Sequence, residues 1–385
     1  MLKDKFLLRP DITFLNHGSF GACPKPVFED YQKWQLMLEQ EPIQFITKTG
    51  VKYLDESKQA LADYINCDKE DLIYTTNPST ALNTVIKSLD LKKGDEILTT
   101  DQEYGAMDRT WNYYCGKVGA KYIHQKITLP LTSKEKILEE FWSGLTSKTK
   151  IVFISQITSP TALIFPVKEI IERAKELGLM TIIDGAHTPA HIPLDLKALN
   201  PDVYTGACHK WLLAPKGSSF LYVKKNWQDT IDPLIVSWGY EAELPSESRY
   251  QDYHQYQGTR DFSAFLCTPA AIQFLKDNQW EERKATCRQQ LQHYYPIVAK
   301  ELESHVICPV TDEFLGQICS IPIQTEQPIE LKELLYNQYK IEIPVVSFSG
   351  DTYLRISFQA YNGEEEIETL INAIRSIKKE TRLLL

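Results

Sequence analysis

The sequence predicts an α/β fold in which helices cover a mostly parallel β-sheet, followed by a smaller α+β domain. Short apolar runs alternate with amphipathic helical patterns over much of the 385 residues, as in sheets built from strand–helix–strand units. Beyond about Thr268 the pattern changes to longer, charged helices separated by single strands. The hydrophobic content of 43% is ordinary for a globular protein and allows a large core.

The first elements follow from the spacing of apolar residues. Residues 27–38 carry Val27, Tyr31, Trp34 and Leu38 at the spacing of an amphipathic helix, and a proline at position 42 ends it. A strand–turn–helix unit comes next. It consists of a buried strand at 72–74, a turn at 75–79 and a helix with the apolar stripe Leu82, Val85, Ile86 and Leu89.

The strand pattern then repeats along the chain. Further strands are expected at 97–98, 151–154, 181–183 and 218–223. Ile170, Ala174 and Leu177 mark the inner face of a helix that ends at Gly178. The smaller domain is expected to contain helices at 270–276 and 281–303, a strand at 316–323 and a final helix at 364–379.

Charge and cysteine usage exclude several function classes. The net charge is −9 and the isoelectric point is near 5.5, which argues against partners such as nucleic acid or an anionic membrane surface. Residues 1–5 mix charges into the N-terminus, and no run of about 18 apolar residues occurs, so we expect a soluble protein without an export signal. The eight cysteines show neither C-x-x-C nor zinc spacing, which predicts reduced thiols, no metal site and a cytoplasmic location.

One acid and one lysine give the first indication of chemistry. Asp184 and Lys210 stand at the ends of neighbouring predicted strands. Pyridoxal phosphate (PLP) needs such a pair, because the lysine forms a Schiff base and the carboxylate keeps the pyridine ring protonated so that it accepts electrons from the substrate Cα. Lys216 is the rival lysine, but its neighbours Pro215 and Gly217 predict an exposed turn. We therefore prefer Lys210.

The segment after the strand at 72–74 is a candidate phosphate site. It opens a helix, where free amide groups and the positive helix end favour a phosphate, and Ser79 and Thr80 add hydroxyl donors. The alternative is a simple Ser/Thr helix cap with Pro78 in the first turn.

Two further strand ends carry polar or aromatic candidates, as open α/β sheets do around a ligand. Tyr104, in the segment 99–106, either stacks over a cofactor or is a partly buried core tyrosine. Ser159 belongs to a hydroxyl-rich segment at 155–161, which either reaches the cofactor or satisfies its own loop.

Two histidines and two arginines complete the candidates. His187 is placed to donate to the phenolic oxygen of the cofactor, and His209 to orient the phosphate or the lysine. Arg355 lies in the otherwise apolar strand 353–358, where it either binds a substrate carboxylate or forms an internal salt bridge. Arg260 is a second carboxylate candidate.

Together these segments resemble the class V aminotransferase family of PLP enzymes, which have the fold type I of PLP-dependent transferases, and within it the isopenicillin N epimerase-like proteins. The resemblance is carried by residues 14–21, 76–83, 184–187, 206–211, 258–261 and 354–357. It implies a seven-stranded, mostly parallel sheet between helices. It also implies a large PLP-binding domain at 15–267 and a small domain made of 1–14 and 268–385.

The resemblance also implies roles for individual residues. Lys210 would carry the cofactor, Asp184 would pair with the pyridinium, His187 would bond the phenolic oxygen and Tyr104 would stack on the ring. The group expected around the phosphate is Ser79, Thr80 and His209, joined by Thr259 from the other subunit of a homodimer with active sites at the interface. Ser159 is expected to contact the cofactor. The group expected around the amino-acid substrate is Arg355, Asn16, His17 and Arg260. Pro78 departs from many relatives because it has no amide N–H to offer the phosphate.

The reaction is less defined than the cofactor, because PLP enzymes share their cofactor chemistry and differ in which Cα bond breaks. Cysteine desulfurases of this family carry a nucleophilic cysteine shortly before the carboxylate-binding arginine, whereas residues 341–354 contain none. Persulfide transfer is therefore disfavoured. We expect an enzyme that removes a Cα proton with Lys210 as base and then epimerises the amino acid; the alternatives are a cysteine or cystine C–S lyase, an aminotransferase, or a non-catalytic PLP-binding protein. For epimerisation, Tyr104 and His17 are the candidates for a second acid–base group.

Overall fold

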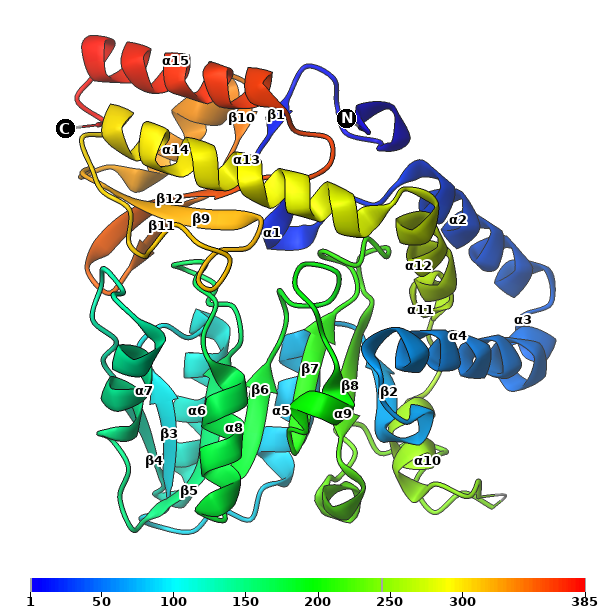
Figure 1. Ribbon diagram of the computed structural model, residues 1–385. Helices are drawn as coiled ribbons and strands as arrows, with labels where there is room; N and C mark the ends of the chain where they lie inside the picture. Colours follow the sequence, from blue (N-terminus) through cyan, green and yellow to red (C-terminus); the bar gives the residue numbers. More distant parts are fainter. Residues whose placement is uncertain (1, 244, 385) are drawn as a thin grey trace.

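A seven-stranded sheet forms the centre of the computed structural model, which describes residues 2–243 and 245–384 (Figure 1). The strand order is β2-β8-β7-β6-β5-β3-β4. Within this sheet β8 is antiparallel to both of its neighbours, and the other strands run parallel to one another. The strands are β2 (Leu72–Thr75), β3 (Glu96–Thr100), β4 (Lys121–Gln125), β5 (Thr149–Ser155), β6 (Met180–Asp184), β7 (Val203–Ala207) and β8 (Ser219–Val223). The predicted mostly parallel seven-stranded sheet is confirmed.

Helices cover both faces of this sheet. Alternate residues of β5 face opposite sides: Ile151 and Phe153 belong to one core cluster with Trp111, whereas Val152 and Ile154 belong to the other with Ile170. Burial on both faces explains why the strand sequences are continuously apolar rather than alternating. One side carries α5 (Pro78–Ser88) and α6 (Gly105–Val118), and the other carries α7 (Lys134–Trp142) and α8 (Val167–Glu176).

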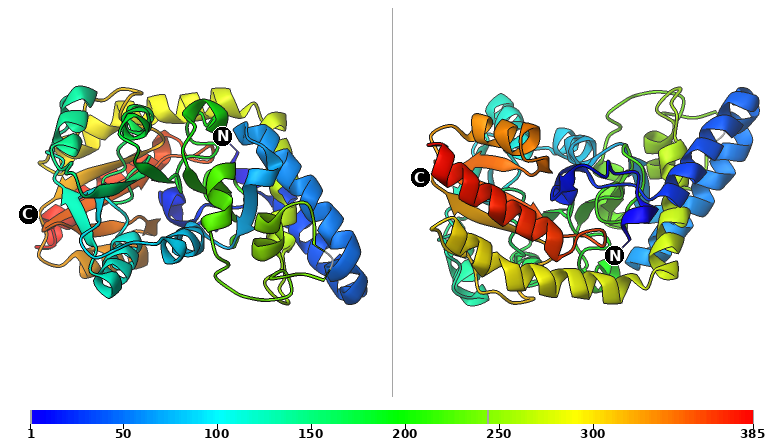
Figure 2. Two further views of the ribbon diagram at one scale, coloured as in Figure 1. Left: turned by 90° about the horizontal axis from the view of Figure 1, so that it is seen from below. Right: turned by 90° about the horizontal axis from the view of Figure 1, so that it is seen from above.

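The C-terminal part is built on a smaller antiparallel sheet in the order β11-β12-β9. Its strands and helices are β9 (Ile318–Ile323), β11 (Val345–Phe348), β12 (Asp351–Ser357), α13 (Trp280–Glu301), α14 (Pro328–Asn337) and α15 (Glu364–Glu380). Figure 2 shows α13 and α15 side by side, and the ion pair between Glu301 and Arg375, at 2.6 Å, joins them. The predicted smaller α+β part is confirmed.

The N-terminal residues connect the two parts. β1 (Thr13–Phe14) pairs in parallel with β10 (Ile341–Glu342), so the start of the chain lies beside the C-terminal elements. After it come α1 (His17–Phe20), α2 (Lys25–Gln40), α3 (Pro42–Gln44) and α4 (Gly50–Ile65), and later in the chain α9 (Leu196–Leu199), α10 (Arg249–Gln255), α11 (Ser263–Leu266) and α12 (Thr268–Asp277). Because α12 packs against α2 and α4, the division at residue 268 stays a prediction.

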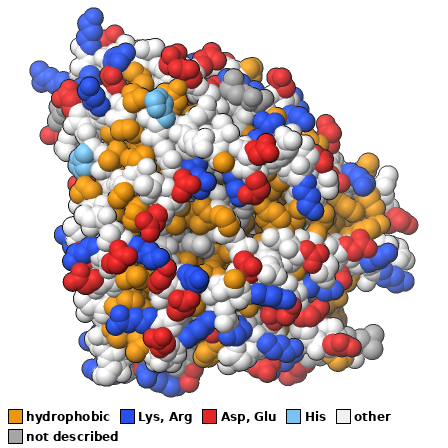
Figure 3. Space-filling model, viewed as in Figure 1, with side chains coloured by type: hydrophobic (Ala, Val, Ile, Leu, Met, Phe, Trp, Pro, Cys, Tyr) orange, Lys and Arg blue, Asp and Glu red, His pale blue; other side chains and the backbone are white. Residues whose placement is uncertain are grey.

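The surface carries charges of both signs. Figure 3 shows Lys and Arg side chains interspersed with Asp and Glu over the face seen in Figure 1. Across residues 2–243 and 245–384, no helix has both the length and the apolar character that crossing a membrane requires. All eight cysteines are free; Cys23 is half-buried and the others are buried. The cytoplasmic location stays a prediction.

Candidate active site

A cleft of about 570 Å³ lies where the parallel strands of the large sheet end. Its walls come from the residues that end or follow β2, β5, β6 and β7, together with α1 and β12. This is the edge at which open α/β sheets gather their ligands. The predicted site residues that line it are Ser79, Tyr104, Ser159, Asp184, His187, His209, Lys210 and Arg355.

Asp184 and Lys210 both face this cleft. Asp184 is the last residue of β6, and its Oδ1 accepts a hydrogen bond from the Ala186 amide at 2.9 Å. Burial raises the pKa of the Asp184 carboxyl, which forms no ion pair with another described residue. Burial and the nearby Arg355 together lower the pKa of Lys210 to about 7, although Asp184 opposes the shift. A substantial share of Lys210 is therefore a neutral, nucleophilic amine near pH 7.

His187 is fixed in one tautomer by its neighbours. The indole N–H of Trp211 donates to His187 Nδ1 at 3.3 Å, and an indole nitrogen can only donate. Nδ1 must therefore be unprotonated. Because burial and the nearby cations hold the pKa of His187 well below its usual range, the ring is neutral and its proton sits on Nε2. That nitrogen lies 3.1 Å from Lys210 Nζ, so His187 offers a hydrogen-bond donor beside the lysine.

Arg355 is a buried cation without a carboxylate partner in the described residues. Nη1 donates to the Ser159 carbonyl at 2.6 Å and Nη2 to Ser19 Oγ at 2.9 Å, while Nε has no partner. The internal salt bridge left open by the sequence is thus absent among the residues described, and an anion from outside the chain would complete the group. Ser19 was not among the predicted site residues.

The start of α5 serves as both helix cap and cleft wall. Asn77 Oδ1 accepts hydrogen bonds from the Thr80 amide at 2.8 Å and from its hydroxyl at 3.2 Å. The helix is therefore capped, but by Asn77 and not by the Ser or Thr that the alternative named. Ser79 lines the cleft and Thr80 does not. His209, which also lines the cleft, is held by a hydrogen bond from its Nδ1 to the Ser218 carbonyl at 2.7 Å.

Besides Thr80, four predicted residues lie outside the cleft of their own chain. His17 is buried, with Nδ1 2.9 Å from the Tyr361 hydroxyl and Nε2 3.1 Å from the Lys210 carbonyl, and burial lowers its pKa to about 3. Both ring nitrogens are engaged, so His17 supports the lysine loop and is not a free acid–base group. The others are Asn16, the exposed Thr259 and Arg260, whose guanidinium lies over the Phe265 ring.

The lysine loop is also held by α1 and by Trp211. Gly21 has a φ of +71°, and a Cβ atom there would lie 2.1 Å from the His209 carbonyl oxygen, so only glycine allows this close approach. Trp211 stacks on His191 at a centroid distance of 3.9 Å in addition to its bond to His187. Gly21 and Trp211 lie in segments that carry the family resemblance, but the sequence does not indicate which residues they contact. Lys216 is exposed, as predicted, yet also lines the cleft.

A comparison with known protein families identifies the chain. The family model described as aminotransferase class-V matches residues 24–370. The chain belongs to the class V aminotransferase family. The relatives include the isopenicillin N epimerase of Amycolatopsis lactamdurans, which is 30% identical over 98% of both chains. An L-cysteine desulfhydrase of Arabidopsis thaliana is 26% identical over 96% of this chain and 88% of that protein.

Solved structures agree on the fold. The cystine C-S lyase C-DES, solved in complex with its reaction product cysteine persulfide, has a TM-score of 0.82 and 22% identity over 95% of this chain and 97% of that one. A cysteine desulfurase from Thermococcus onnurineus has a TM-score of 0.84 and 20% identity over 98% and 97% of the two chains. The chain therefore has the fold type I of PLP-dependent transferases, as predicted.

The residues in the cleft fit pyridoxal phosphate, the cofactor of this class V aminotransferase family member. Asp184 is a buried carboxyl without a cation of its own, which a protonated ring nitrogen would supply. The Nε2–H of His187 would bind the phenolic oxygen, and Lys210 would hold the aldehyde carbon. Ser79, at the start of α5, and His209 would hold the phosphate. When bound, the cofactor supplies an electron sink for charge developing at the substrate Cα.

We expect the rate at which the cofactor-free protein captures PLP to rise with pH, with a midpoint near pH 7. Only the neutral amine attacks the aldehyde, and Lys210 has a pKa of about 7 instead of the ordinary 10.5. Absorbance measurements of capture between about pH 6 and pH 9 would show the midpoint. Removing a nearby cation in Arg355→Met should move it to higher pH, because Arg355 lowers the Lys210 pKa. A wild-type midpoint near pH 10 would contradict the assignment.

Proposed function

We propose that the chain is an enzyme that removes the Cα proton of an amino acid, with Lys210 as the base. The observation that carries this proposal is the placing of a partly neutral buried amine, a carboxyl and a guanidinium without a carboxylate partner among the described residues around one cleft. A general base works best when its pKa lies near the operating pH, and Lys210 has a pKa of about 7.

The other side chains position the substrate. Arg355 would bind the α-carboxylate in a two-point contact, and Ser19 and the Ser159 carbonyl hold the guanidinium in place before the substrate arrives. The Nε2–H of His187, which is fixed by the bond from Trp211, would donate to the phenolic oxygen of the cofactor and hold it beside Lys210. These contacts support amino-acid chemistry and do not depend on the nature of the side chain at Cβ.

Epimerisation is the outcome that we propose first. It returns a proton to the opposite face of Cα, so no atom is gained or lost, and it needs a second acid–base group. Of the two candidates, His17 is engaged outside the cleft, whereas Tyr104 lines it and is 46% exposed. Tyr104 is accordingly the proposed second group. The similarity to isopenicillin N epimerases over nearly the whole chain supports this order.

A C–S lyase is the second candidate, and the desulfhydrase relatives favour it. In that reaction the Cα–H and Cβ–S bonds both break, so that cysteine yields sulfide, ammonia and pyruvate after water is added. No cysteine of the described chain lines the cleft. A protein-bound persulfide is therefore not part of the proposal. Transamination remains the third outcome.

One experiment separates these outcomes. A panel of L-amino acids, including cysteine and cystine, is incubated in D₂O with the PLP-loaded enzyme, and Cα deuterium, product chirality, keto acids and sulfide are measured. Deuterium with the D-enantiomer indicates an epimerase, and pyruvate with sulfide indicates a lyase. Keto acid together with an aminated cofactor indicates an aminotransferase. If no amino acid exchanges its Cα proton or releases a keto acid, the proposed function is wrong.

We further propose that the enzyme is a homodimer in which Thr259 reaches the phosphate of the partner. Thr259 is exposed and does not line the cleft of its own chain. Upstream of it, Ile235, Val236 and Trp238 are 50%, 68% and 85% exposed, an apolar group that a second subunit would cover.

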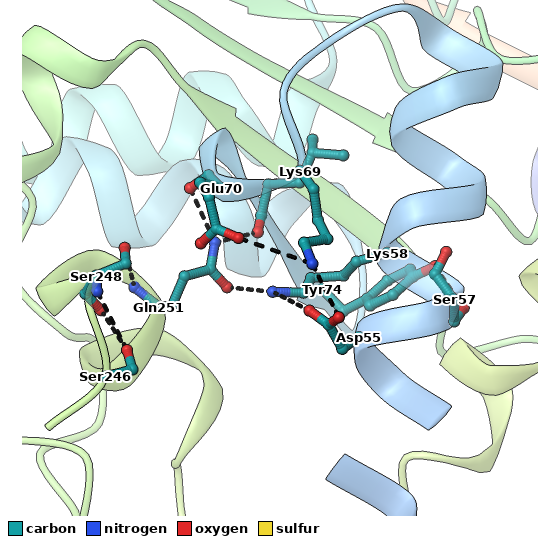
Figure 4. A network of polar contacts seen from close by, with 10 residues as sticks. Asp55, Ser57, Lys58, Lys69, Glu70, Tyr74, Ser246, Ser248 and Gln251 are labelled. Atoms are coloured by element: carbon teal, nitrogen blue, oxygen red, sulfur yellow. Dashed lines mark hydrogen bonds and ion pairs between the residues drawn. The ribbon is translucent and has the colours of Figure 1, made fainter. Parts of the chain in front are cut away.

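A polar network holds the helix that leads to Thr259. Figure 4 shows Gln251 of α10 beside Lys58 of α4, where the buried lysine donates to Gln251 Oε1 at 2.6 Å. Gln251 Nε2 in turn donates to the backbone carbonyl oxygens of Glu70 and Leu72 at 2.9 and 2.6 Å. These hydrogen bonds join α10 to α4 and to the edge strand β2. They fix the position of α10, the helix that precedes the segment with Thr259.

Mixing two inactive variants should restore activity if Thr259 acts across the dimer. Lys210→Ala removes the lysine, and Thr259→Glu places a negative charge beside the phosphate. A mixed dimer would contain one site with both defects and one intact site, so co-expression should recover about a quarter of the wild-type activity. If Thr259 served its own chain, every site would carry a defect and the mixture would stay inactive.

A further inference from the structure

Glu103 is a fully buried carboxyl beside the cleft, and the roles given above do not use it. It lies in the turn between β3 and α6, next to Tyr104, and its exposed fraction is 0%. Its Oε1 accepts from the Thr100 hydroxyl at 2.7 Å, and its Oε2 accepts from the Ser155 amide at 2.9 Å and lies 2.6 Å from Ser155 Oγ. No Lys or Arg pairs with it in the described chain. Burying a carboxyl away from any cation costs free energy, which hydrogen bonds to the carboxyl partly offset.

Ser155 connects Glu103 to the acid of the cofactor site. It is the last residue of β5, it lines the cleft, and its register partner in β6 is Asp184. One end of the Glu103 contact therefore holds the turn that presents Tyr104, and the other end holds the strand beside Asp184. The family resemblance implies that Tyr104 stacks on the face of the cofactor ring and that Asp184 pairs with its nitrogen.

The surroundings of Glu103 favour the neutral form of its carboxyl. Burial, with Asp184 and Asp108, raises its pKa to about 8, although the hydrogen bonds from Ser155 and Thr100 oppose the shift. The groups that face it are Thr100 of β3, Tyr122 of β4, Ser155 of β5, Asp184 of β6 and Asp108 of α6, and none of them is a cation. The Thr100 hydroxyl donates to Oε1, and the hydroxyl and amide of Ser155 both donate to Oε2. Both oxygens of Glu103 are therefore held, one from the end of β3 and the other from the end of β5.

We propose that Glu103 is a positioning residue that fixes Tyr104 relative to Asp184 through Ser155, and so sets how the cofactor ring is held. This inference rests on the proposed roles of Tyr104 and Asp184 and adds a third residue, with no contact to the substrate, to the cofactor site. It does not depend on which reaction follows.

The test compares two buried glutamates at opposite ends of β3. Glu103→Ala should raise the Kd for PLP at least about tenfold and reduce the visible circular dichroism of the bound cofactor, because the ring loses its fixed surroundings. Glu103→Gln keeps the size and can still accept from the Ser155 amide, so it should restore most of both signals. Glu96→Ala is the matched control: Glu96 is also buried, accepts from Thr146, and lies at the other end of the strand. It should lower Tm and leave the cofactor signals unchanged.

Each result decides the question. If Glu103→Ala lowers Tm but binds PLP with wild-type affinity and dichroism, as the Glu96 control does, the inference is wrong. If Glu103→Ala does not fold, Ser155→Ala replaces it, because this variant removes the hydroxyl that contacts Glu103 and keeps the backbone. Wild-type PLP affinity and dichroism in Ser155→Ala would also contradict the inference. Wild-type protein that binds no PLP would instead contradict the proposed function.

Discussion

Lys210→Ala is expected to fold, to hold no covalent cofactor and to lose at least about 10³-fold in rate. The side chain is the only amine for which the structure combines a pKa of about 7 with a hydrogen-bond contact to His187 among the described residues. Without it, both the anchoring of the aldehyde and the proton transfer at Cα are lost. Borohydride reduction followed by intact-mass measurement would show the wild type, and not the variant, gaining one reduced phosphopyridoxyl group.

Lys216→Ala is the matched control for this prediction. Lys216 lines the same cleft and was the rival lysine in the sequence, but it is exposed and lies in the turn before Gly217, whose φ is +87°. Its variant should still gain the reduced cofactor. Loss of the label in Lys216→Ala, with labelling kept in Lys210→Ala, would show that Lys216 and not Lys210 binds the cofactor.

The sequence could predict the parts of this site that depend on strand ends. Asp184 ends the strongly apolar strand β6 and Lys210 comes shortly after β7. Because the carboxyl ends of parallel strands share one edge, their meeting in one cleft followed from the predicted topology. The polar edge strand β4 was not predicted. Its residues are half-buried or exposed, so the segment lacks the continuous apolar run that marked the inner strands.

Contacts between distant segments could not be predicted. The two bonds of the Arg355 guanidinium reach across 196 and 336 positions of the sequence, to Ser159 and Ser19. The tautomer of His187 depends on Trp211, whose ring orientation is set by packing on His191. His17 illustrates the opposite case: its segment suggested a place at the substrate, but both its nitrogens bind groups behind the lysine loop.

Arg355→Ala is expected to lower kcat/KM for an amino acid by about 30- to 150-fold, the effect of about 2 to 3 kcal/mol for lost charge-assisted hydrogen bonds. The guanidinium is buried and, among the described residues, it has no carboxylate partner and its Nε makes no hydrogen bond, so a substrate carboxylate would supply the missing negative charge. Arg355→Lys should recover part of the loss, because it restores the charge without the planar two-point contact. Arg260→Ala, at the rival arginine held over Phe265, should cost much less.

A substrate without a carboxylate makes this prediction specific. For the amide of the same amino acid, wild type and Arg355→Ala should have nearly equal kcat/KM, because the group that Arg355 recognises is absent in both measurements. PLP capture should persist in the variant, although at a higher pH midpoint, since Arg355 lowers the pKa of Lys210. If the substitution were equally costly for the acid and for the amide, Arg355 would be acting on the fold or on the cofactor, and the carboxylate would have to bind elsewhere in the cleft.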